Sequence, residues 1–387
     1  MSRKICVITS GRADYGLLRG VMHAINNESE LQLQIIASGS HLSADLSSSY
    51  AAIEADGFVV NKQIPSIMGD DSPIGVSQSM GLAVAGFASA FASLRPDIVL
   101  VLGDRYEIFS AVAAALVTRI PVAHIHGGEL TLGAYDDAMR HCITKMSHLH
   151  FVAAEAYKKR VIQLGESPET VFMVGGLGID SMMHEAPLDR NGLEAALDFA
   201  LGPKNLLITF HPTTLSPISA TEQISQLLIA LERLSNTHFI FTAPNVDNGG
   251  REIIEKLEKF TSGKPHSKIY TYLGQQRYYA CLQHCDVIVG NSSSGILEAP
   301  SFKIPTVNIG TRQDGRLRAL SVIDCDVTAD SIEAAIQLAY SQKFQAQLKD
   351  VENPYGRGGA IPKIVNVLKE YPLKDIISKK FFDFGSI

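Results

Sequence analysis

The sequence predicts an α/β protein with two Rossmann-like, doubly wound domains that face each other across a cleft. Short, continuous apolar runs alternate with helix-forming segments along the chain, and many of these runs end in polar loops rich in small residues. The alternation is broken at residues 175–193, which are rich in glycine, proline and charge, and then starts again. Apolar runs of this kind indicate parallel strands that are buried on both faces. A chain of 387 residues is also long for a single hydrophobic core.

The N-terminal half supplies the first sheet. We predict strands at Lys4–Thr9, Leu31–Ala37, Ile98–Leu102, from Pro121–His124 onward, at His150–Val152 and at Val171–Val174. Helices are expected from about Tyr15 to Asn26, after a loop within Asp70–Leu94, over Glu107–Thr118 and from Asp136 onward. The break at residues 175–193 places the domain boundary, so residues 1–180 form the first domain.

The second half restarts the alternation without repeating the first half's sequence. Five strands are predicted, at Asn205–Phe210, His238–Thr242, Lys268–Tyr272, Asp286–Val289 and Thr306–Ile309. A helix is expected over Ile361–Glu370. Residues 181–365 therefore form a second Rossmann-like domain with its own parallel sheet.

The stretch 98–129 carries a concentration of reactive side chains. A buried strand, an Ala-rich helix and a second strand follow one another there, and this βαβ unit makes the two strands parallel neighbours. Parallel sheets bind ligands at the carboxyl ends of their strands. The first of these ends carries Asp104 and Arg105, and the second carries His126 and Glu129. An acid, a base and a cation are therefore expected to converge on one rim.

The first two strands add polar groups to the same rim. Arg12 and Asp14 follow the first strand, and His41 follows the second. A structural role is the alternative, since an aspartate after a strand commonly caps the next helix, and this applies to Asp104 and to the loop Ser10–Gly16. Two histidines, two acids and an arginine on adjacent strand ends favour a functional cluster in the central unit.

The segment Gly290–Gly295, with the sequence GNSSSG, is the clearest ligand-binding motif of the second half. It follows a buried strand and precedes a predicted helix, so backbone N–H groups and the helix dipole can meet an anion. Neither a Walker A loop nor a GxGxxG fingerprint is present. The alternative is an ordinary Ser-capped helix start. Glu298 is placed to accept hydrogen bonds from a ribose diol, and Arg312 can add charge beside a diphosphate.

Two facing sheets, one with a phosphate-binding loop, suggest that a nucleotide-diphosphate sugar binds in the cleft. Asn245 and Leu273 follow two other strands of the second half and extend its binding rim. The net charge of −6 gives no basic face for nucleic acid. The apolar run at the N-terminus is too short for a signal peptide, and we expect no span of transmembrane length and a cytoplasmic protein. The five cysteines lack a CxxC pair and are expected to be reduced core residues.

The order of the motifs SGRADYG, GSHL, GDR, HIHGGE, DDAMRH, HPTT, GNSSSG and GTRQ resembles that of the hydrolysing UDP-N-acetylglucosamine 2-epimerases of sialic acid biosynthesis. The resemblance extends over nearly the whole chain. It implies a glycosyltransferase-B-like fold in which residues 366–387 form a tail that packs back on the N-terminal domain. It also implies sugar chemistry in the first domain, UDP binding in the second, and no metal or redox cofactor. We further expect a homo-oligomer, either a dimer or a tetramer.

The resemblance assigns roles to individual positions. Asp104 and Asp136 match catalytic acids of the family, and His211 matches an interdomain histidine near the diphosphate. The remaining matches are binding residues: Arg12, Arg105 and Arg312 as cationic contacts, Ser292 and Ser293 as phosphate contacts, and Glu298 as the ribose ligand. Some relatives have a carboxylate where this chain has His126, and either His126 or Glu129 can serve as the base here.

The implied reaction is anti elimination of UDP across C1–C2 to 2-acetamidoglucal, followed by hydration that inverts C2 and releases N-acetylmannosamine. The same chemistry on UDP-2,4-diacetamido-2,4,6-trideoxyglucose, which leads to legionaminic acid, is an open alternative. A glycosyltransferase of the same fold and a non-catalytic nucleotide-sugar sensor are two further alternatives. A transferase needs an acceptor groove and leaves the acid cluster without a clear role.

Overall fold

The structure is a computed structural model that describes residues 2–42, 47–65, 72–132, 135–184, 188–213, 218–244 and 250–384. Two compact units make up the chain. The first unit comprises Met1–Glu129, Tyr135–Ser181 and Gly358–Ile387, and the second comprises Leu130–Ala134 and Met182–Arg357. The segment after Gly358 therefore belongs to the first unit, whereas the sequence placed residues up to 365 in the second domain.

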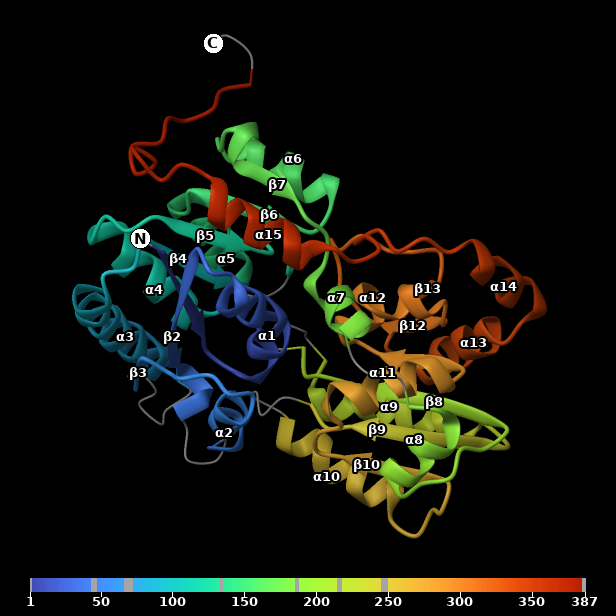
Figure 1. Ribbon diagram of the computed structural model, residues 1–387. Helices are drawn as coiled ribbons and strands as arrows, with labels where there is room; N and C mark the ends of the chain where they lie inside the picture. The colour runs from blue at the N-terminus through green and yellow to red at the C-terminus, as the bar shows by residue number, and fades with distance from the viewer. Residues whose placement is uncertain are drawn as a thin grey trace. The chain divides into compact units, whose positions relative to one another are not determined.

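The first unit contains a seven-stranded sheet with the strand order β3-β2-β1-β4-β5-β6-β7 (Figure 1). Its strands are β1 (Arg3–Thr9), β2 (Leu31–Ser38), β3 (Lys62–Ile64), β4 (Ile98–Leu102), β5 (Val122–Ile125), β6 (Leu149–Val152) and β7 (Val171–Met173). The recorded pairings are all parallel, and β4 pairs directly with β5, as the βαβ prediction requires. The order reverses between β1 and β4, so the carboxyl ends of these two strands flank the position where such sheets bind ligands.

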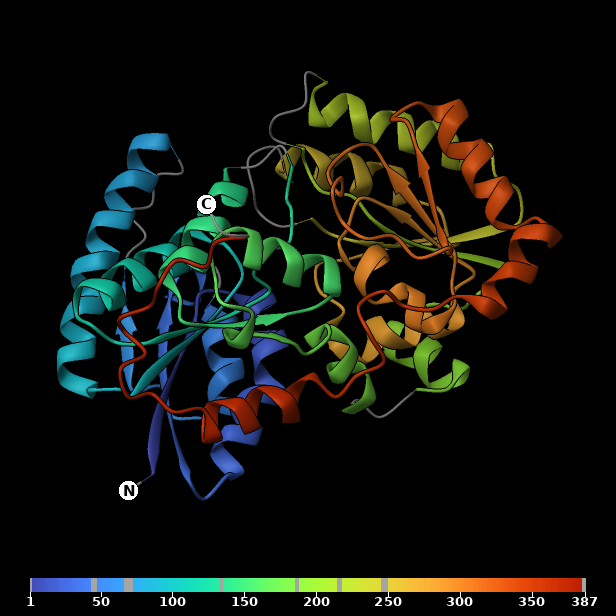
Figure 2. The same ribbon diagram turned by 90° about the horizontal axis from the view of Figure 1, so that it is seen from above.

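Helices cover both faces of this sheet, because alternate strand residues point to opposite sides. Ile5 and Val7 of β1 pack with α1 (Arg12–Asn27) and α15 (Ala360–Glu370), which lie side by side (Figure 2). Cys6 and Ile8 face the other way. That second face is covered by α3 (Pro73–Leu94), α4 (Tyr106–Val117) and α5 (Asp136–Met146). The unit also contains α2 (Ser47–Ala55), α6 (Glu155–Gln163) and the first residues of α7 (Leu177–His184).

Helix α3 is the longest helix described, with 22 residues. By length and composition alone it could cross a membrane, so the expectation that no span approaches that length is wrong. Core helices of globular proteins meet the same two criteria. Ala83, Phe87 and Phe91 on one face of α3 are buried against the sheet.

The second unit contains a six-stranded sheet with the order β10-β9-β8-β11-β12-β13. Its strands are β8 (Lys204–Thr209), β9 (Thr237–Thr242), β10 (Ser267–Tyr270), β11 (Val287–Gly290), β12 (Thr306–Ile309) and β13 (Val322–Cys325). One face is covered by α9 (Ala220–Glu232), α10 (Gly250–Thr261) and α13 (Ala329–Ala339), and the other by α8 (Arg190–Leu197) and α11 (Gly274–His284). Two short helices complete the unit, α12 (Ser294–Leu297) and α14 (Gln342–Gln347). Both sheets are thus doubly wound, which confirms the predicted fold class.

Three expectations need correction. The sequence did not predict β3 or β13, because these edge strands lack the continuous apolar run of a central strand; their residues Lys62, Gln63 and Asp324 are polar. All five cysteines are free, but Cys142 is exposed on α5 and is therefore not a core residue. The helix predicted after Gly290–Gly295 is only four residues long.

Candidate active site

The carboxyl end of β4 places Asp104 at the rim of the first sheet. All five residues of β4 are buried, and Gly103, with φ of +83°, turns the chain out of the sheet. Asp104 then presents a carboxylate that remains 19% exposed, and helix α4 begins two residues later. Arg105, and not Asp104, occupies the N-cap position of that helix, so the capping alternative does not account for Asp104.

Asp104 is held by a buried arginine that the sequence did not single out. The guanidinium of Arg140, from α5, forms an ion pair with Asp104 and donates to the backbone oxygen of His126 at 3.0 Å. A carboxylate oxygen of Glu129 lies 3.9 Å from the same guanidinium. Burial opposes the charge on Arg140, but the carboxylates of Asp104 and Glu129 outweigh it, and the pKa of Arg140 is raised. The guanidinium of Arg140 therefore connects helix α5 to the chain segments that follow β4 and β5.

His126 and Glu129 form a second pair in this cluster. His126 Nδ1 lies 3.1 Å from a carboxylate oxygen of Glu129, and both side chains are almost fully buried. His126 Nε2 is buried and has no hydrogen-bond partner among the described residues. The backbone of His126 has φ of +66°, a conformation that costs energy outside glycine and is concentrated at functional sites. A histidine with a carboxylate beside one ring nitrogen and no described partner at the other can act as a general base.

His124 supports the turn that carries Asp104. Its Nε2 lies 2.8 Å from the backbone oxygen of Gly103, and its Nδ1 lies 3.2 Å from the hydroxyl of Thr144 on α5. A carbonyl oxygen can only accept, so Nε2 must carry the proton. Complete burial lowers the pKa of His124 to about 3. His124 is therefore neutral at physiological pH and acts as a brace between β4, β5 and α5.

The neutral histidines predict that the protein loses stability in mild acid. Burial lowers the pKa of His124 to about 3 and that of His148 to about 4, both from 6.5. At a pH between the folded pKa of each histidine and 6.5, the unfolded chain binds more protons than the folded chain. The free energy of unfolding should therefore fall as pH drops below about 6.5, by up to ~1.4 kcal/mol per pH unit for each histidine. Urea unfolding of the whole chain between pH 7.5 and 5 measures this slope.

His148→Asn is the matched variant for that measurement. Asparagine Oδ1 keeps the bond that His148 Nδ1 accepts from the Val122 N–H at 3.1 Å, but it does not titrate. The slope below pH 6.5 should become shallower in this variant. An equally steep slope would show that His148 is not one of the groups that take up protons on unfolding.

Arg12, His41 and Arg105 lie together near the ends of β1, β2 and β4. His41 is almost fully buried with Nε2 2.9 Å from the hydroxyl of Thr9, and burial, followed by the charges of Arg12 and Arg105, lowers its pKa against the opposing effect of Asp14. Arg105 is half exposed and pairs with the buried Glu107 at 3.2 Å. Two arginines beside a neutral histidine form a positive region at the rim.

Asp14 belongs to the structural alternative. Its carboxylate accepts the backbone N–H of Ser10 at 2.6 Å and that of Gly11 at 2.8 Å. It occupies the N3 position of α1 and accepts the N–H of the N-cap residue Gly11. Asp14 therefore fixes the loop before Arg12 and is not a reactive group. Asp136 opens α5 one helical turn before Arg140, so the two side chains lie on the same face of that helix.

In the second unit, Asn291 ties three strand ends together. Its side chain accepts the His211 N–H at 2.7 Å and donates to the His211 oxygen at 2.8 Å. Its backbone oxygen accepts from Arg312 at 3.1 Å and from the buried Gln313 at 2.8 Å. Burial, with the Arg312 charge adding to it, lowers the pKa of His211 to about 3. A neutral imidazole and a guanidinium thus stand at the ends of β8 and β12, with β11 between them.

The GNSSSG loop departs from β11 through a glycine that no other residue can replace. Gly290 has φ of +137°, and a Cβ there would lie 1.9 Å from the backbone oxygen of Thr209. Ser292 and Ser293 follow, both partly buried. Helix α12 has four residues because Pro300 ends regular helix nearby, so its dipole is much weaker than the sequence suggested. Backbone N–H groups and serine hydroxyls are the polar groups that this loop offers to a ligand.

The other predicted binding residues of this unit differ in what they offer. Glu298 accepts a hydrogen bond from Ser294, and burial raises the pKa of its carboxyl. Leu273 is the N-cap residue of α11; its side chain is in the core and its backbone oxygen accepts from Arg277 at 2.5 Å. Its side chain is therefore not a rim group. Asn245 lies outside the described residues.

Two residues of this arrangement were missed from the sequence, Arg140 and Asn291. Both stand inside motifs that were recognised, DDAMRH and GNSSSG. The available signal for Arg140 was its place one turn after Asp136 on a helix whose other buried positions are apolar or small. Among the described residues, no group of three or more His, Cys, Asp or Glu is arranged to hold a metal ion.

Comparison with known proteins identifies the family. A family profile described as UDP-N-acetylglucosamine 2-epimerase matches residues 23–369. The chain is 42% identical over 383 residues to the Campylobacter jejuni GDP/UDP-N,N'-diacetylbacillosamine 2-epimerase (hydrolyzing), covering 98% of this chain and 99% of that protein. It is 37% identical over 380 residues to the Legionella pneumophila UDP-N,N'-diacetylbacillosamine 2-epimerase (hydrolyzing), with coverage of 98% and 99%.

A solved structure agrees at the level of the fold. The Staphylococcus aureus protein MnaA, solved with UDP, superposes with a TM-score of 0.77 at 20% identity, over 99% of this chain and 100% of that one. Since the family profile spans most of the sequence and both relatives match from end to end, the chain belongs to the UDP-N-acetylglucosamine 2-epimerase family, in its hydrolysing branch.

Proposed function

We propose that this protein converts UDP-N,N'-diacetylbacillosamine, which is UDP-2,4-diacetamido-2,4,6-trideoxyglucose, and water into UDP and the free sugar with inverted C2. The observation that carries the proposal is the buried cluster of Asp104, Arg140, Glu129 and His126 at one strand-end rim. Proton transfer at a weakly acidic carbon needs such a positioned base and acid in a site sheltered from water. The names of the relatives at 42% and 37% identity favour this sugar over UDP-N-acetylglucosamine.

In the first step, His126 Nε2 takes the proton from C2 while the C1–O bond to UDP breaks. The electron pair of the C2–H bond forms the C1=C2 double bond, and the pair of the C1–O bond leaves with UDP. Glu129 fits the role of a stabilising group, because its carboxylate oxygen lies 3.1 Å from His126 Nδ1, close enough to stabilise the imidazolium that forms. Of the two candidates for the base, His126 and Glu129, we therefore propose His126.

In the second step, a proton is added to C2 from the opposite face and the oxygen of water is added to C1. Asp104 and Asp136 are the carboxyl groups proposed for proton delivery and for activating the water. Arg140 fixes Asp104 by its ion pair, and it lies one turn from Asp136 on α5. A carboxylate held by a buried cation keeps one geometry through both steps.

The second unit is proposed to bind UDP. The backbone N–H groups and hydroxyls of Ser292 and Ser293 suit the phosphates, Arg312 supplies charge, and Glu298 accepts from the ribose diol. His211 is neutral, so it can donate one N–H to the departing phosphate, and the arriving negative charge raises its pKa. The positive region of Arg12 and Arg105 is proposed to attract the anionic substrate.

Glu298→Ala should weaken UDP binding by about 1–3 kcal/mol, the scale for losing a charged hydrogen-bond acceptor. Titration calorimetry with UDP measures the change. Glu258→Ala, an exposed position on α10, is the matched control and should leave UDP affinity unchanged. Equal affinities of Glu298→Ala and the wild type would remove Glu298 from the nucleotide site.

Incubation with each UDP-sugar and no acceptor tests the proposed activity. We expect UDP and free sugar from UDP-N,N'-diacetylbacillosamine, with a higher kcat/KM than from UDP-N-acetylglucosamine. A preference for UDP-N-acetylglucosamine would keep the reaction and make N-acetylmannosamine the product. Release of UDP only when an acceptor is added would indicate a glycosyltransferase. If no UDP-sugar released UDP under either condition, the non-catalytic nucleotide-sugar sensor would be the remaining hypothesis. The proposed setting is the cytoplasmic synthesis of a legionaminic or sialic acid, by a homo-oligomer.

A further inference from the structure

We propose that Lys379, in the C-terminal tail, is a positioning residue for the reaction, because it fixes the end of the helix that carries Arg140 and Asp136. Lys379 lies in the part of the predicted tail, residues 366–387, that comes after α15. This inference rests on the proposed function for its effect on rate, but the contact itself does not depend on any substrate. Lys379 lies 234 residues from Lys145, so the contact joins two distant parts of the first unit.

The ammonium of Lys379 meets three oxygen atoms around the end of α5. It donates to the backbone oxygen of Lys145 at 2.5 Å, to that of Ser147 at 2.6 Å, and to a carboxylate oxygen of Glu166 at 2.7 Å. These three bonds use all three donors of the ammonium. Helix α5 ends at Met146, so Lys145 and Ser147 supply carbonyl groups that have no partner inside the helix. A cation at this position also complements the negative end of the helix dipole.

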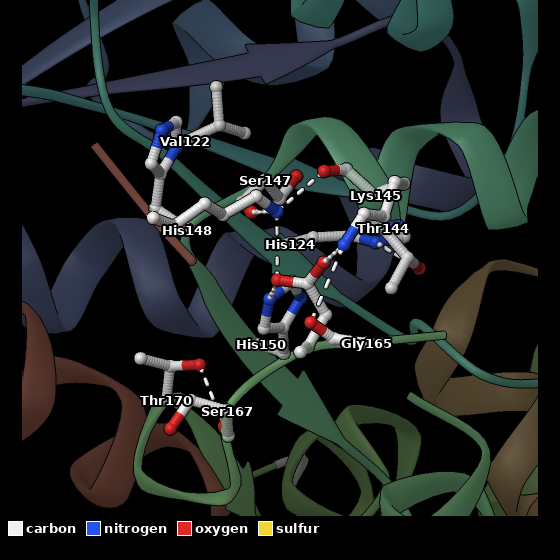
Figure 3. Close-up of polar contacts among 12 residues, drawn as sticks. Val122, His124, Thr144, Lys145, Ser147, His148, His150, Gly165, Ser167 and Thr170 are labelled. Atoms are coloured by element: carbon white, nitrogen blue, oxygen red, sulfur yellow. Dashed lines mark hydrogen bonds and ion pairs between the residues drawn. The ribbon is translucent and has the colours of Figure 1, made fainter. Parts of the chain in front are cut away.

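Glu166 is the buried counter-charge of this contact. It is 2% exposed and accepts from three side chains: Lys145 at 2.8 Å, His150 Nε2 at 3.0 Å and Lys379. Burial opposes its ionisation, but these hydrogen bonds lower its pKa to about 2. Figure 3 shows Lys145, Ser147 and His150 close together; Lys145 belongs to α5, Ser147 follows that helix and His150 belongs to β6. A buried carboxylate with three donors depends on all of them for its stability.

Two phenylalanines after Lys379 hold the tail in place. The ring of Phe381 lies against Gly165, where a Cβ would come within 2.3 Å of the ring, and the Lys145 ammonium lies 4.5 Å from its centroid. The Phe382 N–H donates to the Gly165 oxygen at 2.9 Å. Phe381 remains 61% exposed, so the backbone bond at Gly165, together with the ring contact, fixes the tail beside Lys379.

One face of α5 connects this contact to the candidate active site. Asp136, Arg140 and Thr144 recur every four residues and lie on one stripe of the helix. Arg140 pairs with Asp104, and Thr144 meets His124, which holds the Gly103 oxygen at 2.8 Å. The position of α5 along its axis therefore decides where Arg140 meets Asp104. A misplacement of about 1 Å at reacting groups can cost roughly 10²-fold in rate.

Lys379→Met tests the inference, with Lys380→Met as the matched control. Methionine keeps most of the stem and removes the ammonium, whereas Lys380 is the neighbouring exposed lysine of the same tail. We expect kcat for UDP release to fall about tenfold in Lys379→Met with KM and UDP affinity within twofold of the wild type. Amide hydrogen exchange of residues 136–146 should be faster, while Lys380→Met should behave as the wild type. Lys379→Arg, which restores the charge and donors, should recover most of kcat.

Two results would overturn the inference: kcat of Lys379→Met equal to that of Lys380→Met, or unchanged exchange in α5. A lower melting temperature with unchanged kcat would likewise reduce Lys379 to a purely structural contact. If Lys379→Met does not fold, Glu166→Gln gives the second measurement and should slow turnover without changing UDP affinity. A wild type that releases no UDP from any UDP-sugar would contradict the proposed function, and hydrogen exchange would still test the anchoring of α5.

Discussion

Replacing Asp104 by asparagine is expected to lower kcat by roughly 10²–10⁴-fold while UDP affinity stays near that of the wild type. The carboxylate stands at the end of β4 and pairs with Arg140, and the proposed role acts on the sugar and not on the nucleotide. Asparagine keeps the shape of the side chain but cannot exchange a proton at neutral pH. Steady-state kinetics of UDP release, together with UDP calorimetry, separates the two effects.

Asp97→Asn is the matched control, because Asp97 precedes the opposite end of the same strand and is exposed. Its activity should equal that of the wild type, although it accepts the Lys4 N–H at 2.8 Å. An Asp104→Asn enzyme as active as the Asp97→Asn control would move the acid to another residue, with Asp136 next in line.

Arg140→Met is expected to damage both stability and activity. Arg140 is 4% exposed, and its loss leaves the carboxylates of Asp104 and Glu129 close together without their shared cation. Breaking a buried pair in this way costs about 3–5 kcal/mol in the free energy of unfolding. The remaining folded enzyme should have a lower kcat because Asp104 is no longer held in place. Urea unfolding and single-turnover kinetics below the unfolding transition measure the two losses.

Arg251→Met, on the exposed face of α10, removes the same charge at the surface and should change stability by less than about 0.5 kcal/mol. If Arg140→Met were as stable and active as this control, the cluster would not depend on its central cation. The account of the rim as one electrostatically coupled unit would then be wrong.

Much of the fold follows from patterns that lie within a few residues of one another. The strands β1, β4 and β11 were predicted because each carries an unbroken, buried apolar run. The edge strand β13 has no fully buried residue, and its place in the sheet depends on pairing with β12. Local sequence does not contain that pairing, so β13 was missed.

The sequence predicted those residues of the candidate site whose positions follow from the order of the strands. Asp104, His126 and Glu129 are close together because β4 and β5 are neighbours. Arg140 is different: its contact with Asp104 depends on the packing of α5 against the sheet, across 36 residues of sequence. For Asp14 the sequence left a functional and a capping role open, and the structure shows that this carboxylate binds backbone N–H groups at the start of α1. Composition at the rim does not distinguish these cases, whereas hydrogen-bond partners do.

Turnover in heavy water is the most direct test of the central claim that the cluster around His126 exchanges the proton at C2. The account predicts that the released sugar carries deuterium at C2, with the configuration there inverted, because one proton is removed and another is added from the opposite face. Hydrolysis at C1 and transfer to an acceptor leave C2 untouched. Nuclear magnetic resonance of the product distinguishes the outcomes. Released sugar with gluco configuration and protium at C2 would contradict the 2-epimerase mechanism.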